Sequence, residues 1–172
     1  MRRKQLDDLV ILALATLVVL ADQWTKSWVR STLPVGVPWN PVPWLRPILS
    51  FTHVTNEGAA FGMLPQLKPV FPFISLAVCA LMFYFYRPLA HGRPWITISL
   101  GLQLGGTLGN LIDRLTQQGR VTDFLDLNFW PLQDWPVFNI ADSSVVVSVC
   151  ILAAVLLLEK DLLQENPPAQ PT

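Results

Sequence analysis

Five short polar clusters interrupt the apolar stretches of this chain. They are Asp-Gln-Trp-Thr-Lys at 22–26, Asn-Glu-Gly-Ala-Ala-Phe at 56–61, Asn-Leu-Ile-Asp-Arg at 110–114, Val-Thr-Asp-Phe at 121–124 and Phe-Asn-Ile-Ala-Asp at 138–142. Charge held next to hydrocarbon is costly, so such residues usually mark a working site. If the apolar stretches cross a membrane four times, all five clusters fall at one face, which predicts a single active site.

The aspartates of these clusters indicate the chemistry. Two carboxylates that lie close together cannot both ionise readily, so one pKa rises and the pair shares a proton. The ionised partner can take a proton from a water that attacks a carbonyl carbon, while the protonated partner donates to the carbonyl oxygen. Spacing alone does not choose the pair. The candidates on the predicted outer side are Asp22, Asp113, Asp123, Asp126 and Asp142.

Several cluster residues also have simple structural explanations. Asp22 and Lys26 are four residues apart and can form an ion pair on one helix face. Asn110, Asp113 and Arg114 share a helix face as well, and the last two form a candidate ion pair that orients a neighbour. These interpretations place the charged residues in support of a site rather than in its chemistry.

The remaining polar positions indicate turns and helix starts. Asn139 is a candidate N-cap, with Asp142 in the first helical turn near the positive end of the helix dipole. Asn56 and Gly58 have the chemistry of a turn, and Gly58 also allows close approach of the backbone. Glycines recur every fourth residue further along, which predicts close helix packing without chemistry. They are Gly101, Gly105 and Gly109.

Composition excludes several classes of site. The chain has only two histidines, His53 and His91, which the expected topology puts on opposite sides of the membrane, so we expect no metal site and no cofactor. Cys79 and Cys150 lie inside apolar stretches and are expected to be small buried hydrophobes. The formal net charge is zero, which gives no indication of nucleic-acid binding.

The elements that must position these residues are membrane helices. Hydrophobic residues make up 52% of the 172 and charged residues 14%, whereas soluble domains carry about 25% charged residues. Four apolar stretches, 9–29, 70–86, 95–111 and 140–158, are long enough to consider as crossings, and in lipid they should be helical. We expect the first stretch to be retained rather than cleaved as a signal peptide, because it ends in a polar motif.

The segments between the crossings predict extramembrane structure. Within 31–69, the β-branched and aromatic run at 49–55 predicts a small extracytoplasmic sheet. Within 115–138, the residues 124–130 are predicted to be an amphipathic piece that lies in the interface. The Pro-rich tail 164–172 is expected to be disordered. The fold class is therefore a mainly α membrane protein, with one catalytic domain at 1–163.

Orientation rests on the density of basic residues rather than on their number. Six Lys and Arg fall on each side of the four predicted crossings. Three basic residues open the chain and two lie in the short connector 87–93, which places both termini in the cytoplasm. Six of the seven tryptophans then fall on the outer side, as in an aromatic belt or a platform for a lipid-bound substrate.

The five clusters, in order and at membrane boundaries, resemble the signature of the lipoprotein signal peptidase family, or signal peptidase II. The match runs from Asp22 to Asp142. The resemblance implies a bacterial inner-membrane aspartyl endopeptidase with four transmembrane helices, an extracytoplasmic β-cradle and an amphipathic interfacial helix. It also implies inhibition by the cyclic peptide globomycin.

The resemblance also assigns residues and a substrate. It implies that Asp123 and Asp142 are the catalytic pair. The supporting or substrate-binding residues would be Asp22, Lys26, Asn56, Gly58, Asn110, Asp113, Arg114 and Asn139. The partner would be a prolipoprotein whose cysteine carries diacylglycerol, cleaved just before that cysteine, in contact with membrane lipids. We expect the enzyme to act as a monomer.

Two other classes fit a small membrane protein with buried carboxylates. A proton- or ion-coupled transporter uses such groups as relays, but it should place them near the middle of the bilayer rather than at one face. A structural adaptor would use the polar clusters for packing only.

Overall fold

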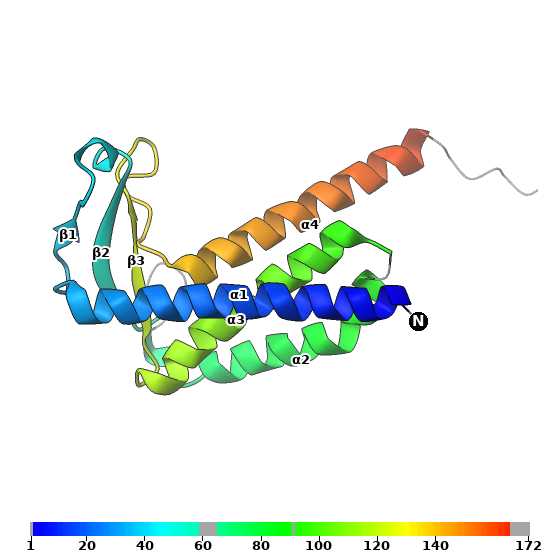
Figure 1. The fold of residues 1–172 in the computed structure, drawn as a ribbon, viewed down its shortest axis with the longest axis horizontal. Helices are drawn as coiled ribbons and strands as arrows, with labels where there is room; N and C mark the ends of the chain where they lie inside the picture. The colour runs from blue at the N-terminus through cyan, green and yellow to red at the C-terminus, as the bar shows by residue number, and fades with distance from the viewer. Residues whose placement is uncertain (1, 59–64, 91, 166–172) are drawn as a thin grey trace, which may run out of the picture.

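The computed structural model describes residues 2–58, 65–90 and 92–165 and contains four long helices. These are α1 (Arg2–Thr32), α2 (Phe71–Ala90), α3 (Pro94–Thr116) and α4 (Ile140–Glu165). Figure 1 shows them running along the long axis of the molecule, with a small sheet standing across one end. The sheet lies beside the C-terminal end of α1 and the N-terminal end of α4, so the polar ends of these helices meet it.

Helix α3 is the central element, because α1, α2 and α4 all pack against it. Its glycines make this possible. A Cβ at Gly105 would lie 2.7 Å from the Cβ of Val18 in α1, and a Cβ at Gly106 would overlap the carbonyl oxygen of Ala141 in α4. The predicted close helix packing is therefore confirmed. Gly106, next to the predicted series, brings α4 onto a second face of α3.

The sheet has three antiparallel strands in the order β1 (Pro38–Trp39), β2 (Leu49–Asn56) and β3 (Val121–Leu127). Two short 3₁₀ turns, Pro43–Leu45 and Pro65–Leu67, flank β2 in the chain. The prediction of a small sheet is confirmed, and its register pairs Asn56 with Val121 and Val54 with Asp123. Polar residues at one end of the sheet are thereby brought beside the helix ends.

A small apolar cluster fixes the sheet to α1. Val29 of α1, Leu33 just after the end of α1 and Phe124 of β3 are buried together. Trp28, from α1, contacts the strand residue Trp39 with tilted rings whose centroids are 5.4 Å apart, and the Trp39 and Phe51 centroids are 5.9 Å apart. Because alternate residues of β3 point to opposite faces, Phe124 in this cluster turns its neighbour Asp123 toward α4.

The predicted interfacial helix at 124–130 is wrong. The residues as far as Leu127 continue β3, residues 129–135 form turns and bends, and Phe138 then forms an antiparallel bridge with Leu125. Val121, Thr122 and Phe124 favour a strand, and pairing with β2 satisfies backbone groups that β2 would otherwise leave open. The apparent amphipathicity of 124–130 was the two-residue alternation of a strand that changes into a turn.

One helix segment in the described part of the chain, Ile140–Leu158, is long and apolar enough to cross a membrane, and Phe71–Tyr86 is a shorter apolar helix. The four predicted crossings coincide with the four helices, but their number stays a prediction. The predicted disordered tail falls mostly on 166–172, outside the described residues, while Gln164 and Glu165 still belong to α4.

Candidate active site

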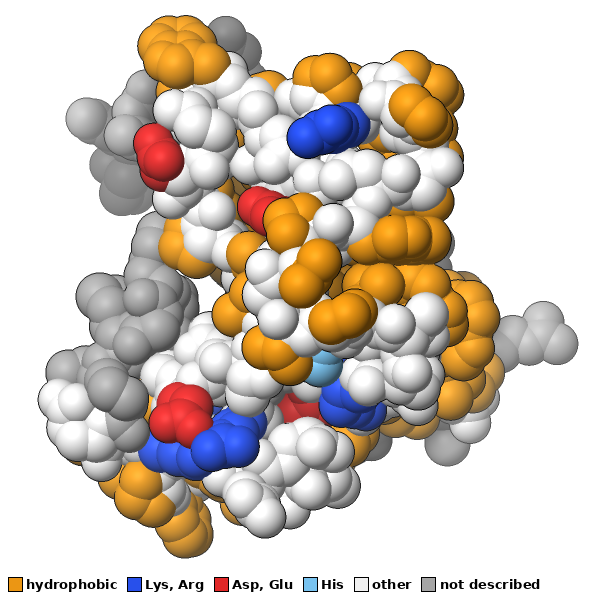
Figure 2. All heavy atoms as spheres, turned by 90° about the vertical axis from the view of Figure 1, so that its left-hand side faces the viewer, with side chains coloured by type: hydrophobic (Ala, Val, Ile, Leu, Met, Phe, Trp, Pro, Cys, Tyr) orange, Lys and Arg blue, Asp and Glu red, His pale blue; other side chains and the backbone are white. Residues whose placement is uncertain are grey.

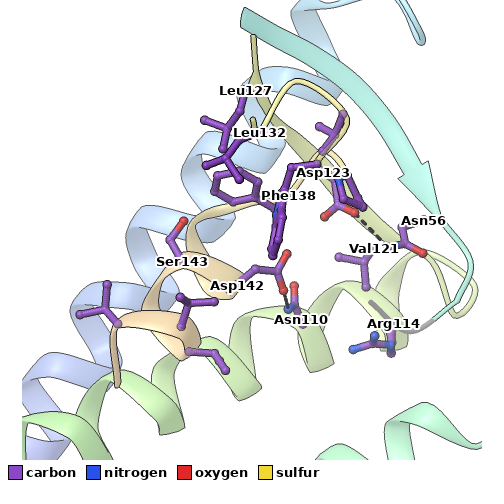
Figure 3. A pocket seen from close by; sticks show the side chains of 16 residues that line it. Asn56, Asn110, Arg114, Val121, Asp123, Leu127, Leu132, Phe138, Asp142 and Ser143 are labelled. Carbon is purple, nitrogen blue, oxygen red and sulfur yellow. Dashed lines mark hydrogen bonds between the residues drawn. The ribbon is translucent and has the colours of Figure 1, made fainter. Parts of the chain in front are cut away.

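Asp123 and Asp142 line one cavity of about 550 Å³ between the sheet and the start of α4. Asp123 comes from β3 and is 2% exposed, while Asp142 comes from the first turn of α4. Figure 3 shows both side chains directed into this cavity, with Asn56 and Asn110 beside them. Of the five candidate aspartates, these are the two that line it.

Asn139 connects the two carboxylates. The backbone N–H of Asp142 donates to Asn139 Oδ1 at 2.8 Å, and the backbone N–H of Asn139 donates to Asp142 Oδ2 at 3.2 Å. This reciprocal pair is a capping box that starts α4 and confirms the predicted N-cap. Because a backbone N–H can only donate, the oxygen of the Asn139 amide must face it. The amide nitrogen then points to Asp123 Oδ1, 2.7 Å away.

Two further asparagines each donate to one carboxylate. Asn56 Nδ2 lies 3.1 Å from Asp123 Oδ2, and the Gly58 N–H fixes this amide by donating to its oxygen at 2.9 Å. Asn110 Nδ2 lies 2.7 Å from Asp142 Oδ1. Each carboxylate therefore accepts two hydrogen bonds from the protein, which fixes its plane relative to the cavity.

The electrostatics of Asp123 favour a shared proton. Burial, and then the negative charge of Asp142, raises the pKa of Asp123 from its usual 3.8 to about 7. The hydrogen bonds from Asn56 and Asn139 act in the opposite direction but do not outweigh the loss of hydration. A carboxyl that is protonated near neutral pH beside a second carboxylate is the arrangement that acid–base catalysis by an aspartate pair needs.

The predicted ion pairs are confirmed in one case and wrong in the other. Lys26 and Asp22 pair at 2.9 Å, as their spacing predicts. Asp113 does not pair with Arg114, because adjacent residues point to different sides of a helix. Instead, Asp113 contacts Lys26 at 3.4 Å and Arg30 at 3.3 Å. Arg30 was missed, although it lies four residues after Lys26 on the same face of α1.

Arg114 turns toward the cavity. Its guanidinium lies 5.3 Å from the ring centre of Phe71, and its buried Nε has no hydrogen-bond partner among the described residues. The remaining candidate, Asp126, accepts a hydrogen bond from Thr52 at 2.6 Å on the sheet. It does not line the cavity.

Most of the cavity wall is apolar, and the sequence analysis did not predict an apolar wall, although Val121 and Phe138 belong to two of the polar clusters. The apolar residues of the wall are Val121, Leu127, Leu132, Trp135, Pro136, Val137, Phe138, Val145, Val146 and Val147. Val146 and Val147 are 57% and 49% exposed on α4, so the cavity continues onto the outer face of that helix. Within the described part of the chain, no group of three His, Cys, Asp or Glu side chains is placed to hold a metal ion.

Most of the chain matches a known protein family. A family model described as "Signal peptidase (SPase) II" matches residues 14–158. The chain belongs to the signal peptidase II family. It is therefore an aspartic endopeptidase of the signal peptidase II type. Family membership favours this class over the two alternatives, a coupled transporter and a structural adaptor.

Individual relatives match nearly their whole length. A lipoprotein signal peptidase of Moorella thermoacetica is 43% identical over 147 residues, which cover 86% of this chain and 92% of that protein. One from Halothermothrix orenii is 40% identical, covering 79% and 87%. A solved structure described as a bacterial membrane enzyme superposes with a TM-score of 0.80 at 31% identity, covering 94% of each chain.

The structure brings the predicted residues of this signal peptidase II together at one end of the bundle. Asp22 and Lys26 come from α1, and Asn56 and Gly58 from the end of β2. The other predicted residues come from α3, from β3 and from the start of α4. Ala59, Ala60 and Phe61 of the second cluster lie outside the described residues.

Proposed function

We propose that this enzyme removes the signal peptide from diacylglyceryl-modified prolipoproteins, cleaving just before the lipidated cysteine with Asp123 and Asp142 as the catalytic pair. The observation that carries the proposal is the composition of one cavity. It combines two hydrogen-bonded carboxylates with a long apolar wall that opens along α4. A lipid-anchored peptide needs both parts, because its acyl chains must stay in an apolar environment while the peptide bond reaches a polar one.

The two aspartates take different parts in the reaction. Asp123 carries the shared proton, because its pKa is raised to about 7, and Asp142 is the ionised partner that removes a proton from water. The water oxygen attacks the carbonyl carbon before the cysteine, while protonated Asp123 donates to the carbonyl oxygen. Asp142 then gives its proton to the leaving amine as the C–N bond breaks, and Asp123 recovers its proton from the tetrahedral hydroxyl. The products are a free signal peptide and an N-terminal lipidated cysteine.

The substrate's lipid supplies much of the positioning. A diacylglyceryl group held in the outer leaflet restricts the scissile bond to the depth of the bilayer surface. Membrane anchoring and binding then restrict the motion of the substrate before the reaction, so this entropy loss does not add to the barrier of the chemical step. The face that carries the sheet supports this location, because hydrophobic side chains spread over it with few charged ones (Figure 2). Exposed tryptophans on the outer segments include Trp44 at 74% and Trp130 at 84%.

The proposed topology has four crossings, α1 to α4, in a single catalytic domain at 1–163. Both termini lie in the cytoplasm and the active site lies at the extracytoplasmic face of the bacterial inner membrane. The common position of the sheet and the aspartate pair at one end of the bundle supports this arrangement (Figure 1). The three basic residues at the N-terminus support its orientation. We propose that the enzyme works as a monomer with no cofactor.

The test is cleavage by purified enzyme in lipid bilayers. The substrate is a diacylglyceryl-modified prolipoprotein, the control is the same peptide without lipid, and mass spectrometry identifies the bond that is cut. Asp123→Asn and Asp142→Asn should each abolish cleavage. Asp134→Asn is the matched control, because Asp134 is an exposed carboxylate in the segment between β3 and α4. Normal turnover by either catalytic-site variant, or equal cleavage of the unlipidated peptide, would contradict the proposal.

A further inference from the structure

Lys26 is a fully buried charge that the proposed reaction does not use. Its side chain is 0% exposed, and its ammonium contacts three acceptors. These are Asp22 Oδ2 at 2.9 Å, Asp113 Oδ2 at 3.4 Å and Asn110 Oδ1 at 2.9 Å. The contact with Asn110 is a hydrogen bond and the other two are ion pairs, so the ammonium has one amide acceptor and two opposite charges beside it.

Each of the two aspartates bound by Lys26 also accepts a hydrogen bond from a backbone N–H beside the site. Asp22 Oδ1 accepts the backbone N–H of Ala141 at 3.0 Å, and Asp113 Oδ2 accepts the backbone N–H of Thr122 at 2.9 Å. Ala141 immediately precedes one proposed catalytic carboxylate, and Thr122 immediately precedes the other. One ammonium therefore joins the two carboxylates that hold the backbone directly before each catalytic residue.

The packing around this arrangement keeps it in place. A Cβ at Gly109 would lie 2.7 Å from Asp22 Oδ2, so the missing side chain provides the room for that carboxylate. Gln23 Nε2 adds a second bridge, because it lies 3.1 Å from Asp22 Oδ2 and 3.3 Å from Asp113 Oδ1. Both aspartates are 0% exposed, so loss of Lys26 alone would leave buried negative charge without this counter-charge, which is costly.

We propose that Lys26 is a positioning residue that sets the separation of the two catalytic carboxylates by clamping Asp22 and Asp113 together. The inference rests on the proposed roles of Asp123 and Asp142. Lys26 also orients Asn110, since only the oxygen of that amide can face an ammonium and the nitrogen is then left for Asp142. Lys26 thus acts on both halves of the pair without touching the substrate.

Arg30 provides a matched comparison on the same helix face. Its guanidinium contacts Asp113 Oδ1 at 3.3 Å and Thr122 Oγ1 at 3.0 Å. No contact joins Arg30 to Asp22 or Asn110 in the described structure. Removing Arg30 should therefore loosen only the β3 side of the site, whereas removing Lys26 should loosen both sides.

The experiment compares Lys26→Met/Asp22→Asn with Arg30→Met. The double change removes one positive and one negative charge together, and it leaves Asp113 paired with Arg30, so the buried charge stays balanced. Lys26→Arg is a second variant that keeps the charge but cannot direct its donors to the same three acceptors. Size-exclusion chromatography and circular dichroism select the folded protein for every measurement.

Hydrogen exchange measures the clamp independently of activity. We expect faster amide exchange in the double variant in peptides covering both 121–124 and 139–142, and in Arg30→Met only in 121–124. The turnover number of the double variant should fall about 100-fold, since a displacement of about 1 Å has that effect. Its KM for the lipid-modified substrate should stay within about threefold, because Lys26 does not line the cavity.

Three results would overturn the inference. They are unchanged exchange in either peptide of the double variant, the same exchange pattern in both variants, and a raised KM with an unchanged turnover number. If the wild-type protein failed to cleave any prolipoprotein, the proposed function would be wrong. The exchange data would then still decide whether Lys26 clamps the two backbone segments.

Discussion

The buried carboxyl of Asp123 should make the stability of the folded protein depend on pH. In the unfolded chain this group ionises near 3.8, and in the folded protein its pKa is about 7. Below pH 3.8 it is protonated in both states and has no effect. As pH rises toward 7, unfolding releases a proton that the folded protein retains, so the free energy of unfolding falls. Above pH 7 the full cost of ionising a buried carboxyl remains.

The size of the effect follows from the difference between the two pKa values. At about 1.4 kcal/mol per pKa unit, the cost reaches about 4 kcal/mol by pH 8. Asp123→Asn removes the ionisation but also turns an amide N–H₂ toward either Asn56 or Asn139, which both donate to this position. That mismatch lowers stability by about 1–3 kcal/mol at every pH. The informative quantity is therefore the difference in unfolding free energy between Asp123→Asn and wild type, and how this difference changes with pH.

Thermal unfolding in detergent between pH 4 and 8 measures this change. Relative to wild type, the midpoint of Asp123→Asn should rise by about 10 °C across the range, at 2–4 °C per kcal/mol for a chain of about this length. Asp134→Asn is the control and should run parallel to wild type, because that carboxylate is exposed. A midpoint difference between Asp123→Asn and wild type that stays constant with pH would refute the raised pKa. A loss of cleavage in Asp123→Asn would then come from altered geometry rather than from a lost proton donor.

Three further outcomes are expected. Gly109→Ala should lower stability by about 1–3 kcal/mol and reduce turnover, since its Cβ would press on Asp22; unchanged thermal unfolding would contradict that contact. Asn139→Ser should keep the helix cap but lose the donor to Asp123, so circular dichroism should be unchanged while turnover falls about 100-fold. Wild-type activity in Asn139→Ser would remove that donor from the mechanism. EDTA should leave turnover unchanged, and a loss that added metal restores would argue for a metal-dependent reaction.

Periodicity and turn chemistry predicted the helices and one strand well, because both signals are local. The strand run at 49–55 became β2, and the candidate N-cap Asn139 starts α4. Residues 124–130 were predicted wrongly because a short alternating run next to a turn also has one apolar side, as an interfacial helix does. Pairing with β2 distinguishes the two, as between Phe51 and Leu125, and such contacts join distant parts of the chain.

The site could be predicted as a set of residues but not as a set of contacts. The sequence placed several aspartates at one face, and the family resemblance chose Asp123 and Asp142. Spacing could not show that Asp113 would prefer Lys26 to the adjacent Arg114, because that preference depends on how closely α1 approaches α3. The apolar wall was also missed, since residues such as Leu132 and Trp135 look like ordinary interface residues until α4 lies beside them.

The contact between Asp22 and Ala141 also bears on the order in which the protein is made. These residues are 119 positions apart, and α4 leaves the ribosome after α1, α2 and α3. Until α4 is inserted, the first three helices carry a buried aspartate that lacks one of its partners, so the unfinished bundle is the less stable form. The same delay keeps Asp142 away from Asp123, so the proposed catalytic pair forms only once α4 is inserted.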